Sequence, residues 1–157
     1  MTHLQIAIRG DMVMDRATAE KLLIEAEKMN RGAWVEHSYH VACLAEKIAH
    51  KAGMDSEKAY IYGLLHDIGR RKGNMQARHA IEGYKYLKGI TYNDYDKLIQ
   101  LCDALSLANG YCYAEKKMVN SVIKFGFKDT TINKWKAILE LKEYFDEKIQ
   151  SDVYLLF

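Results

Sequence analysis

Residues 34–71 read WVEHSYHVACLAEKIAHKAGMDSEKAYIYGLLHDIGRR, and this stretch decides the fold because it predicts two consecutive helices of different character. The first helix, expected over residues 34–52, has apolar side chains at helical spacing on one face, and Gly53 ends it. That face comprises Val41, Leu44, Ala45 and Ile48. The second helix, AYIYGLLHDIG, is apolar nearly all round, which predicts a central, buried helix that ends at Gly69.

The remainder of the chain continues the helical pattern, with short breaks at glycine, asparagine and aspartate. Asp15 is a good N-cap for a helix that reaches Asn30, and Asn93 or Asp94 begins another that runs to the break at Asn109-Gly110. Further helices are expected over residues 76–88 and 114–125 and from about Thr131, the last with a buried stripe of Trp135, Ile138, Leu139, Phe145 and Ile149.

The predicted architecture is therefore all-α, a single-domain helical bundle. There is no proline, and no repeat or low-complexity tract marks a domain boundary. We expect residues 1–14 to form an N-terminal extension and residues 15–157 to form the helical domain. A length of 157 residues, 49% of them apolar, suits one domain with a hydrophobic core.

Charge and hydropathy argue against several classes of protein. The net charge is +2, from 23 basic and 21 acidic residues, which is too balanced for a protein that coats a nucleic-acid polymer. No apolar run is long enough for a membrane span, and the N-terminus lacks a signal pattern, so we expect a cytoplasmic protein. Homo-oligomerisation stays open. Reduced thiols are expected at Cys43, Cys102 and Cys112.

His37 is the first polar residue in an apolar setting. It falls on the same face of its predicted helix as the apolar stripe, whereas His40 lies at the edge of that stripe and His50 points away. A buried imidazole needs a partner for at least one nitrogen. Taken alone, such a histidine is more often a hydrogen-bonded core residue than a ligand.

Two further segments place metal-type ligands in apolar surroundings. His66 and Asp67 end the most apolar helix, and Asp103 lies within LIQLCDALSLA. A carboxylate in such a place requires a compensating cation or several hydrogen-bond donors. Two histidines and two carboxylates make a mixed nitrogen and oxygen site that suits Mn, Fe, Co, Ni or Zn better than Ca or Mg.

The stretch HSYHVACLAEKIAHKAGMDSEKAYIYGLLHDIGRR resembles the front half of the HD-domain phosphohydrolases, and CDALS resembles the segment that bears the last aspartate of that family. The resemblance covers roughly residues 34–110. It implies an HD-like helical fold and a divalent metal ion held, in the family's order, by His37, His66, Asp67 and Asp103. His40 falls where many members have arginine, so His37 is taken as the ligand.

Some members of that family hold a second metal ion with two more histidines. His79 resembles the first of these, but no histidine follows it. The connection from His79 to Asp103 is also short. Two alternatives remain: a site for one metal ion, or a sequence from which part of this region is missing.

The resemblance implies hydrolysis of a phosphate ester of a small molecule, for which we expect a nucleotide, by water that a metal ion activates. Asp67 is expected to orient this water or take its proton, and His79 to bind a second ion or donate to phosphate. Arg70, Arg71 and Arg78 are the expected phosphate ligands, although a solvated turn is an equal alternative for Arg71.

Other interpretations stay open. The chain could be a catalytically weak or inactive HD-like module that binds metal and nucleotide as a sensor or interaction domain, or a helical interaction domain without metal. For Lys116 and Lys117, which follow the helix of Asp103, we expect a solvated helix face.

Overall fold

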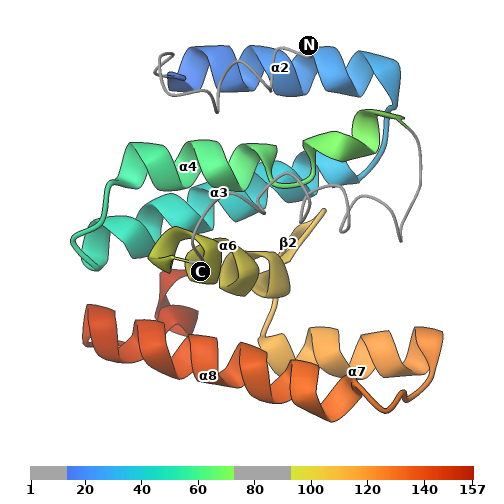
Figure 1. The fold of residues 1–157 in the computed structure, drawn as a ribbon, viewed down its shortest axis with the longest axis vertical. Helices are drawn as coiled ribbons and strands as arrows, with labels where there is room; N and C mark the ends of the chain where they lie inside the picture. Colours follow the sequence, from blue (N-terminus) through green and yellow to red (C-terminus); the bar gives the residue numbers. More distant parts are fainter. Residues whose placement is uncertain (1–13, 73–92) are drawn as a thin grey trace.

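The computed structural model describes residues 14–72 and 93–157. Within these ranges the chain forms six α-helices, two short 3₁₀ helices (η) and one two-stranded antiparallel hairpin (Figure 1). The elements are α2 (Arg16–Met29), α3 (Trp34–Lys51), α4 (Ser56–Leu65), η1 (Ile68–Lys72), α6 (Asp94–Leu105), β1 (Ser106–Leu107), β2 (Gly110–Tyr111), α7 (Ala114–Phe125), α8 (Thr131–Ile149) and η2 (Val153–Leu156). The all-helical architecture expected from the sequence is confirmed.

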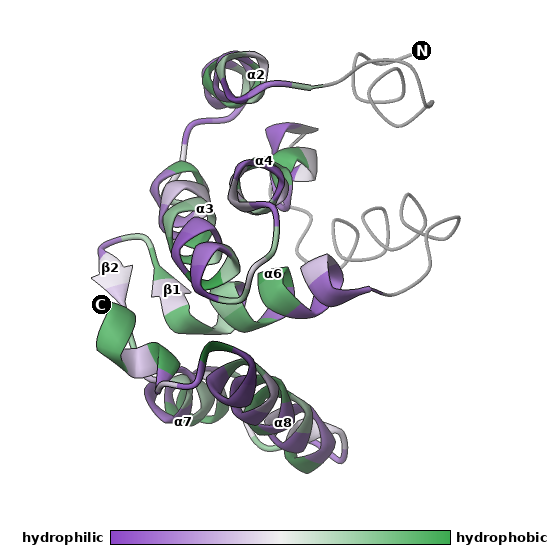
Figure 2. Ribbon diagram, turned by 90° about the vertical axis from the view of Figure 1, so that its left-hand side faces the viewer, coloured by the Kyte–Doolittle hydropathy of each residue, from purple (hydrophilic) through white to green (hydrophobic). Residues whose placement is uncertain are grey.

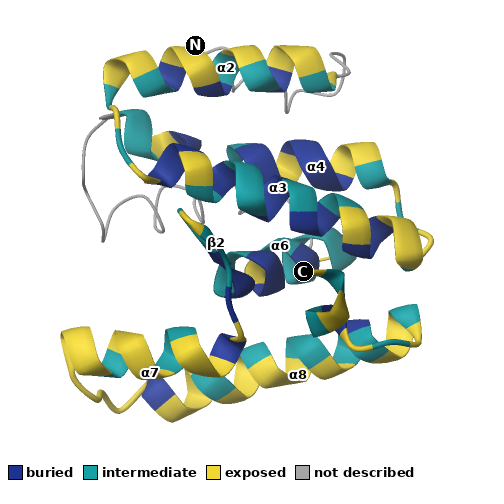
Figure 3. Ribbon diagram, turned by 180° about the vertical axis from the view of Figure 1, so that it is seen from behind, coloured by how far each residue is buried: buried dark blue, intermediate teal, exposed yellow. Residues whose placement is uncertain are grey.

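The helices stack in layers along the longest axis of the molecule. Figure 1 shows α2 at one end, α3 and α4 next to it, α6 below them, and α7 and α8 at the opposite end. The hydrophobic stretch of α6 runs across α3 and α4 (Figure 2). Figure 3 shows that buried residues concentrate in α3, α4 and α6, whereas α7 and α8 are largely exposed or half-buried. The centre of the bundle is therefore the α3–α4 pair.

Gly63 permits the close approach of α4 to α3. A Cβ atom at this position would lie 2.7 Å from Cα of Ala42 and 2.9 Å from its nitrogen. Both are backbone atoms, which cannot move aside as a flexible side chain can. The two helices are therefore in direct backbone contact where their side chains approach the candidate site.

Two hydrophobic clusters meet at α3. One contains the buried side chains of α2, the start of α3 and α4, including Leu23 and Leu64. The other joins the later part of α3 to α6, α8 and η2, with Leu101 and the fully buried Phe145. Because α3 contributes to both, it is held from two sides, which makes it a rigid support for a functional side chain.

The predicted helix starts are confirmed at two positions. The side chain of Asp15 accepts a hydrogen bond from the backbone N–H of Thr18 at 2.8 Å and caps α2. Asn93 caps α6 in a capping box with Asp96, in which each side chain accepts from the backbone N–H of the other residue. Such caps satisfy backbone donors that a helix leaves unpaired.

The predicted ends of two helices are wrong. The helix expected to reach Gly69 stops at Leu65, and His66 and Asp67 form a turn before η1. The helix expected to reach Asn109 stops at Leu105, because Ser106 adopts an extended backbone and starts the hairpin with β2. After this end, the carbonyl oxygen of Leu105 accepts a hydrogen bond from the Cys112 N–H at 2.9 Å.

One member of the predicted buried stripe of α8 is also misplaced. Phe145 is fully buried, but Leu139 is 38% exposed. Phe145 belongs to the hydrophobic cluster shared with α3 and α6, and Leu139 is not among the residues packed against that cluster. The helix predicted over residues 76–88 lies outside the described residues, as does nearly all of the predicted N-terminal extension. None of the helices in the described ranges is both long enough and apolar enough to cross a bilayer.

We predict a pH-dependent contribution to stability from Asp94, which ties α6 to α8. Lys148 Nζ and Tyr144 Oη each donate to its carboxylate at 2.9 Å. The hydrogen bonds from Lys148 and Tyr144 lower the pKa of Asp94 to about 2. The folded state therefore favours the ionised form, so this stabilisation is complete above the ordinary aspartate pKa of 3.8 and is lost as the pH falls through about 2.

The test is urea unfolding of the wild type and Asp94→Asn at about pH 6 and about pH 2. About a third of the Asp94 side chain is exposed (35%), and solvent weakens its ion pair. At the higher pH the wild type should therefore be more stable than Asp94→Asn by no more than about 1 kcal/mol. The difference should shrink by at least half at the lower pH. An equal difference at both pH values would contradict the prediction.

Candidate metal centre

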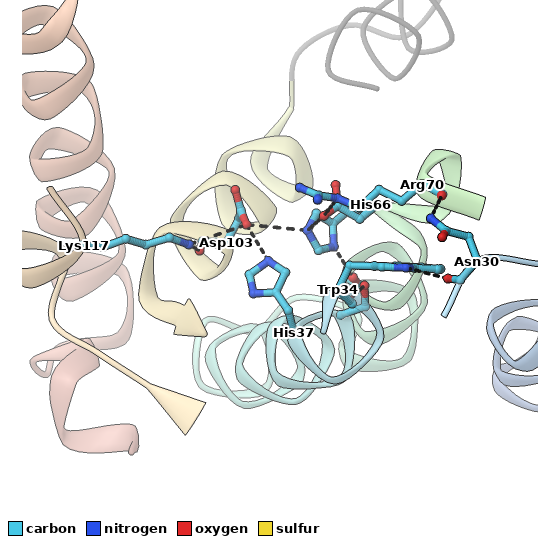
Figure 4. Close-up of polar contacts among 10 residues, drawn as sticks. Asn30, Trp34, His37, His66, Arg70, Asp103 and Lys117 are labelled. Atoms are coloured by element: carbon cyan, nitrogen blue, oxygen red, sulfur yellow. Dashed lines mark hydrogen bonds and ion pairs between the residues drawn. The ribbon is translucent and has the colours of Figure 1, made fainter. Parts of the chain in front are cut away.

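Four side chains from three parts of the chain converge at the α3–α4–α6 junction, and Figure 4 shows His37, His66 and Asp103 among them. His37 comes from α3, His66 and Asp67 from the turn after α4, and Asp103 from α6. Nε2 of His37 lies 2.8 Å from Oδ1 of Asp103. Nε2 of His66 lies 3.6 Å from the same oxygen and 3.7 Å from Oδ2 of Asp67. The structure thus brings together all four residues that the sequence singled out as ligands.

The backbone of α4 orients the His66 ring. His66 is the C-cap residue of α4, and its Nδ1 lies 2.7 Å from the carbonyl oxygen of Gly63. Since a carbonyl can only accept, Nδ1 carries the proton and donates it. In the neutral ring Nε2 then has no proton and directs its lone pair toward the two carboxylates. This is the tautomer that can bind a metal ion through Nε2.

The Nε2 atom of His66 is buried and has no hydrogen-bond partner within the described ranges. A lone pair that faces two carboxylate oxygens without a partner is electrostatically unfavourable. A cation at this point would be attracted by all three groups. Because Mn, Fe, Co, Ni and Zn accept both imidazole and carboxylate ligands, this donor set fits such an ion.

Side-chain atoms of His37, His66 and Asp67 lie within 4.8 Å of one another, close enough to share one ion. Asp103 adds a fourth residue and the second carboxylate, beside both imidazoles. His40 does not join the group, because its ring packs edge-on against Tyr111 with the ring centroids 5.3 Å apart.

The local electrostatics are dominated by the two carboxylates. Burial lowers the pKa of His66, but the neighbouring Asp103 and Asp67 outweigh burial and raise it. Partial burial opposes ionisation of Asp103, but the hydrogen bond from His37, with His66 and Lys117 nearby, holds the pKa of Asp103 well below its usual range. A site in which Asp103 is ionised attracts cations.

Arg70 lies beside the site. Its Nε donates to Oδ2 of Asp67 at 2.7 Å, and its own carbonyl oxygen accepts a hydrogen bond from Asn30 Nδ2 at 2.7 Å. Arg71, in the same η1 helix, is partly exposed. The predicted roles of Arg78 and His79 fall on residues outside the described ranges.

Lys117 is the residue that sequence reasoning missed. Its Nζ donates to the backbone carbonyl oxygens of Asp103 and of Ser106, the latter at 3.0 Å. It also lies 3.9 Å from Oδ1 of Asp103 (Figure 4). The expectation of a solvated helix face is therefore wrong for Lys117, whereas Lys116 is exposed as expected. No pattern in the sequence indicated this contact, since it depends on the unpredicted hairpin that turns α7 back toward α6.

A shallow surface depression of about 540 Å³ lies near the start of α3, and its lining does not include the four converging residues. It lies between the end of α2, the start of α3 and the loop of the hairpin, and its lining includes Ala33, Glu36 and Asn109. Ala33 precedes His37 by one helical turn, as the hydrogen bond from the His37 N–H to the Ala33 carbonyl oxygen shows.

Comparison with known proteins gave one positive result. The family model described as HD domain matches residues 34–117, which include the four converging residues and Lys117. Neither the search of curated proteins nor the search of solved structures found a match.

Proposed function

The chain belongs to the HD domain family, and from this premise we propose that it is a metal-dependent phosphohydrolase that cleaves a phosphate ester of a small molecule. The observation that carries the proposal is the buried Nε2 of His66, which has no hydrogen-bond partner among the described residues and faces two carboxylates beside a second imidazole.

We assign His37, His66, Asp67 and Asp103 as the ligands of one divalent transition-metal ion. When bound, such an ion lowers the pKa of coordinated water toward neutrality and polarises a phosphoryl oxygen. The mixed nitrogen and oxygen donors favour Mn, Fe, Co, Ni or Zn. A second ion would require ligands such as His79, outside the described residues.

Asp67 is the proposed catalytic carboxylate. Its side chain is 11% exposed and lies between His66 and Arg70, so it is held in place from two directions. From this position the carboxylate can orient the attacking water or accept its proton. The water would attack phosphorus, the bond from phosphorus to the leaving oxygen would break, and the leaving oxygen would take up a proton.

The surface depression between the end of α2, the start of α3 and the hairpin loop is the proposed place for the part of a substrate beyond its phosphate. With its phosphate at the metal centre, the rest of the molecule would extend toward Glu36 and Asn109. These side chains offer carboxylate and amide groups suited to the hydroxyl and amino groups of a nucleoside. A nucleotide is therefore the proposed class of substrate.

We predict that Arg70 contributes to phosphate binding. When a metal ion compensates Asp67, the guanidinium can donate to a phosphate oxygen instead. Arg70→Met should raise KM about tenfold or more, as expected for the loss of a charge-assisted hydrogen bond, and should change kcat less. Steady-state kinetics on the metal-loaded protein measure both values, with the exposed Lys136→Met as control. An unchanged KM would remove Arg70 from the substrate site.

The test of the function is a screen for phosphate release. Protein stripped by a chelator and reloaded with each metal in turn is incubated with nucleotides and simple phosphate esters. We expect hydrolysis that the chelator abolishes and reloading restores. Tight nucleotide binding without hydrolysis, with metal present, would instead indicate a binding module, and hydrolysis that survives both stripping and Asp67→Ala would contradict the proposal.

A further inference from the structure

Lys117 connects α7 to the C-terminal end of α6, where Asp103 lies. Its ammonium group donates to the carbonyl oxygens of Asp103 and Ser106 and lies 3.9 Å from the Asp103 carboxylate. The side chain is 34% exposed, so most of it is covered. All three acceptors belong to the last turn of α6 or to the first residue after it.

The chemistry of these contacts suits a structural cation. The carbonyl groups at the end of a helix lack partners within the helix and carry the negative end of its dipole. A lysine ammonium has three N–H donors. Two of them are used by the carbonyl oxygens, and the positive charge faces Oδ1 of Asp103.

Oδ1 is also the atom that His37 and His66 approach, at 2.8 and 3.6 Å. Lys117 therefore contacts Asp103 at two points. Its ammonium group donates to the backbone carbonyl oxygen of Asp103 and lies close to the Asp103 carboxylate. It fixes the end of the helix that presents Asp103, and its charge limits the repulsion between Asp103 and the nearby Asp67. A group with these contacts has little capacity left for a substrate phosphate.

We propose that Lys117 is a positioning residue of the metal centre, which holds the Asp103 carboxylate where it can share an ion with His37 and His66. This inference rests on the proposed function, since it requires that the site binds a metal ion. Lys116, the preceding residue on α7, has the same charge but is exposed, and it offers a matched control.

The test is titration of the metal-free full chain with Co²⁺, followed by the visible absorption bands of the bound ion. These bands report the geometry of the ligands, and the titration gives the affinity. Lys117→Met should weaken Co²⁺ binding about 10- to 100-fold, as expected when a group that orients a ligand is lost, and should change the shape of the bands. Lys116→Met should leave both unchanged, and Lys117→Arg should recover most of the affinity.

Two further measurements separate the possible failures. Circular dichroism of each metal-free variant checks that it is folded, and Lys117→Gln, which keeps amide donors but loses the charge, should also bind Co²⁺ more weakly if Lys117→Met does not fold. The positioning role would be overturned, with the metal site left intact, if Lys117→Met or Lys117→Gln bound Co²⁺ with the affinity and absorption bands of the wild type. A folded wild type that binds no Co²⁺ would overturn the proposed function and this inference together.

Discussion

Asp67→Ala should abolish phosphate-ester hydrolysis, with a fall in rate of at least about 10²- to 10⁴-fold, and should remove the bound metal ion. The carboxylate lies 3.7 Å from Nε2 of His66 and is one of only a few buried polar side chains in the described residues. It is both a proposed ligand and the proposed acceptor of the proton from water. Asp103 is the other described carboxylate near Nε2 of His66. It does not take the position of Asp67, because it approaches from α6 and contacts His37.

The measurement combines phosphate release with metal content, using Asp129→Ala as control. Asp129 is exposed in the turn between α7 and α8, far along the chain from the site. The loss of stability in Asp67→Ala should be modest, because the turn around residue 67 keeps its backbone contacts, such as the hydrogen bond from the Arg70 N–H to the carbonyl of residue 67. Full metal occupancy in Asp67→Ala would show that the ligand assignment is wrong.

Gly63→Ala should destabilise the protein by about 1–3 kcal/mol, as overpacking of a well-packed interior does. Helix propensity alone predicts the opposite sign, since alanine is favoured over glycine within a helix by about 1 kcal/mol. The added Cβ atom would lie 2.7 Å from Cα of Ala42, so α3 and α4 would have to separate. That separation moves His37 away from His66, so metal affinity should fall as well.

Urea unfolding and metal titration measure the two effects. Asn120→Ala, at an exposed position of α7, is the control, because it raises helix propensity without adding a contact in the core. Asn120→Ala should leave the stability unchanged or slightly higher, and it should not change metal binding. A Gly63→Ala protein as stable as the wild type, or more so, would show that α3 and α4 tolerate a wider spacing.

Local patterns in the sequence were sufficient to predict the helical fold and to single out four polar residues in apolar surroundings, and the HD-domain resemblance implied that these residues converge. The apolar face of α3 placed His37 toward the interior, and the apolar character of α4 carried His66 and Asp67 to the centre of the bundle. These signals arise within single helices, from spacing and burial. Asp103 was found in the same way, as a carboxylate among apolar neighbours.

Other features depend on contacts between distant elements, which periodicity does not contain. The end of α6 at Leu105 follows from the pairing of β1 with β2, and two-residue strands have no recognisable pattern. The contact of Lys117 with Asp103 requires that hairpin. In the sequence, Gly63 appears only as a residue that weakens a helix. The structure shows that it allows α4 to pack directly against the backbone of Ala42. The exposed Leu139 shows that an apolar residue on a helix need not face the core.

Metal content is the measurement that tests the central claim most directly. Purified protein is stripped, reconstituted with each candidate transition metal, freed of excess metal, and subjected to elemental analysis beside His66→Ala, whose circular dichroism confirms that it is folded. We expect about one equivalent of a divalent transition metal in the wild type and less than about a tenth of an equivalent in His66→Ala. Less than about a tenth of an equivalent in the wild type, even after reconstitution, would contradict the account and leave a helical domain without a metal site.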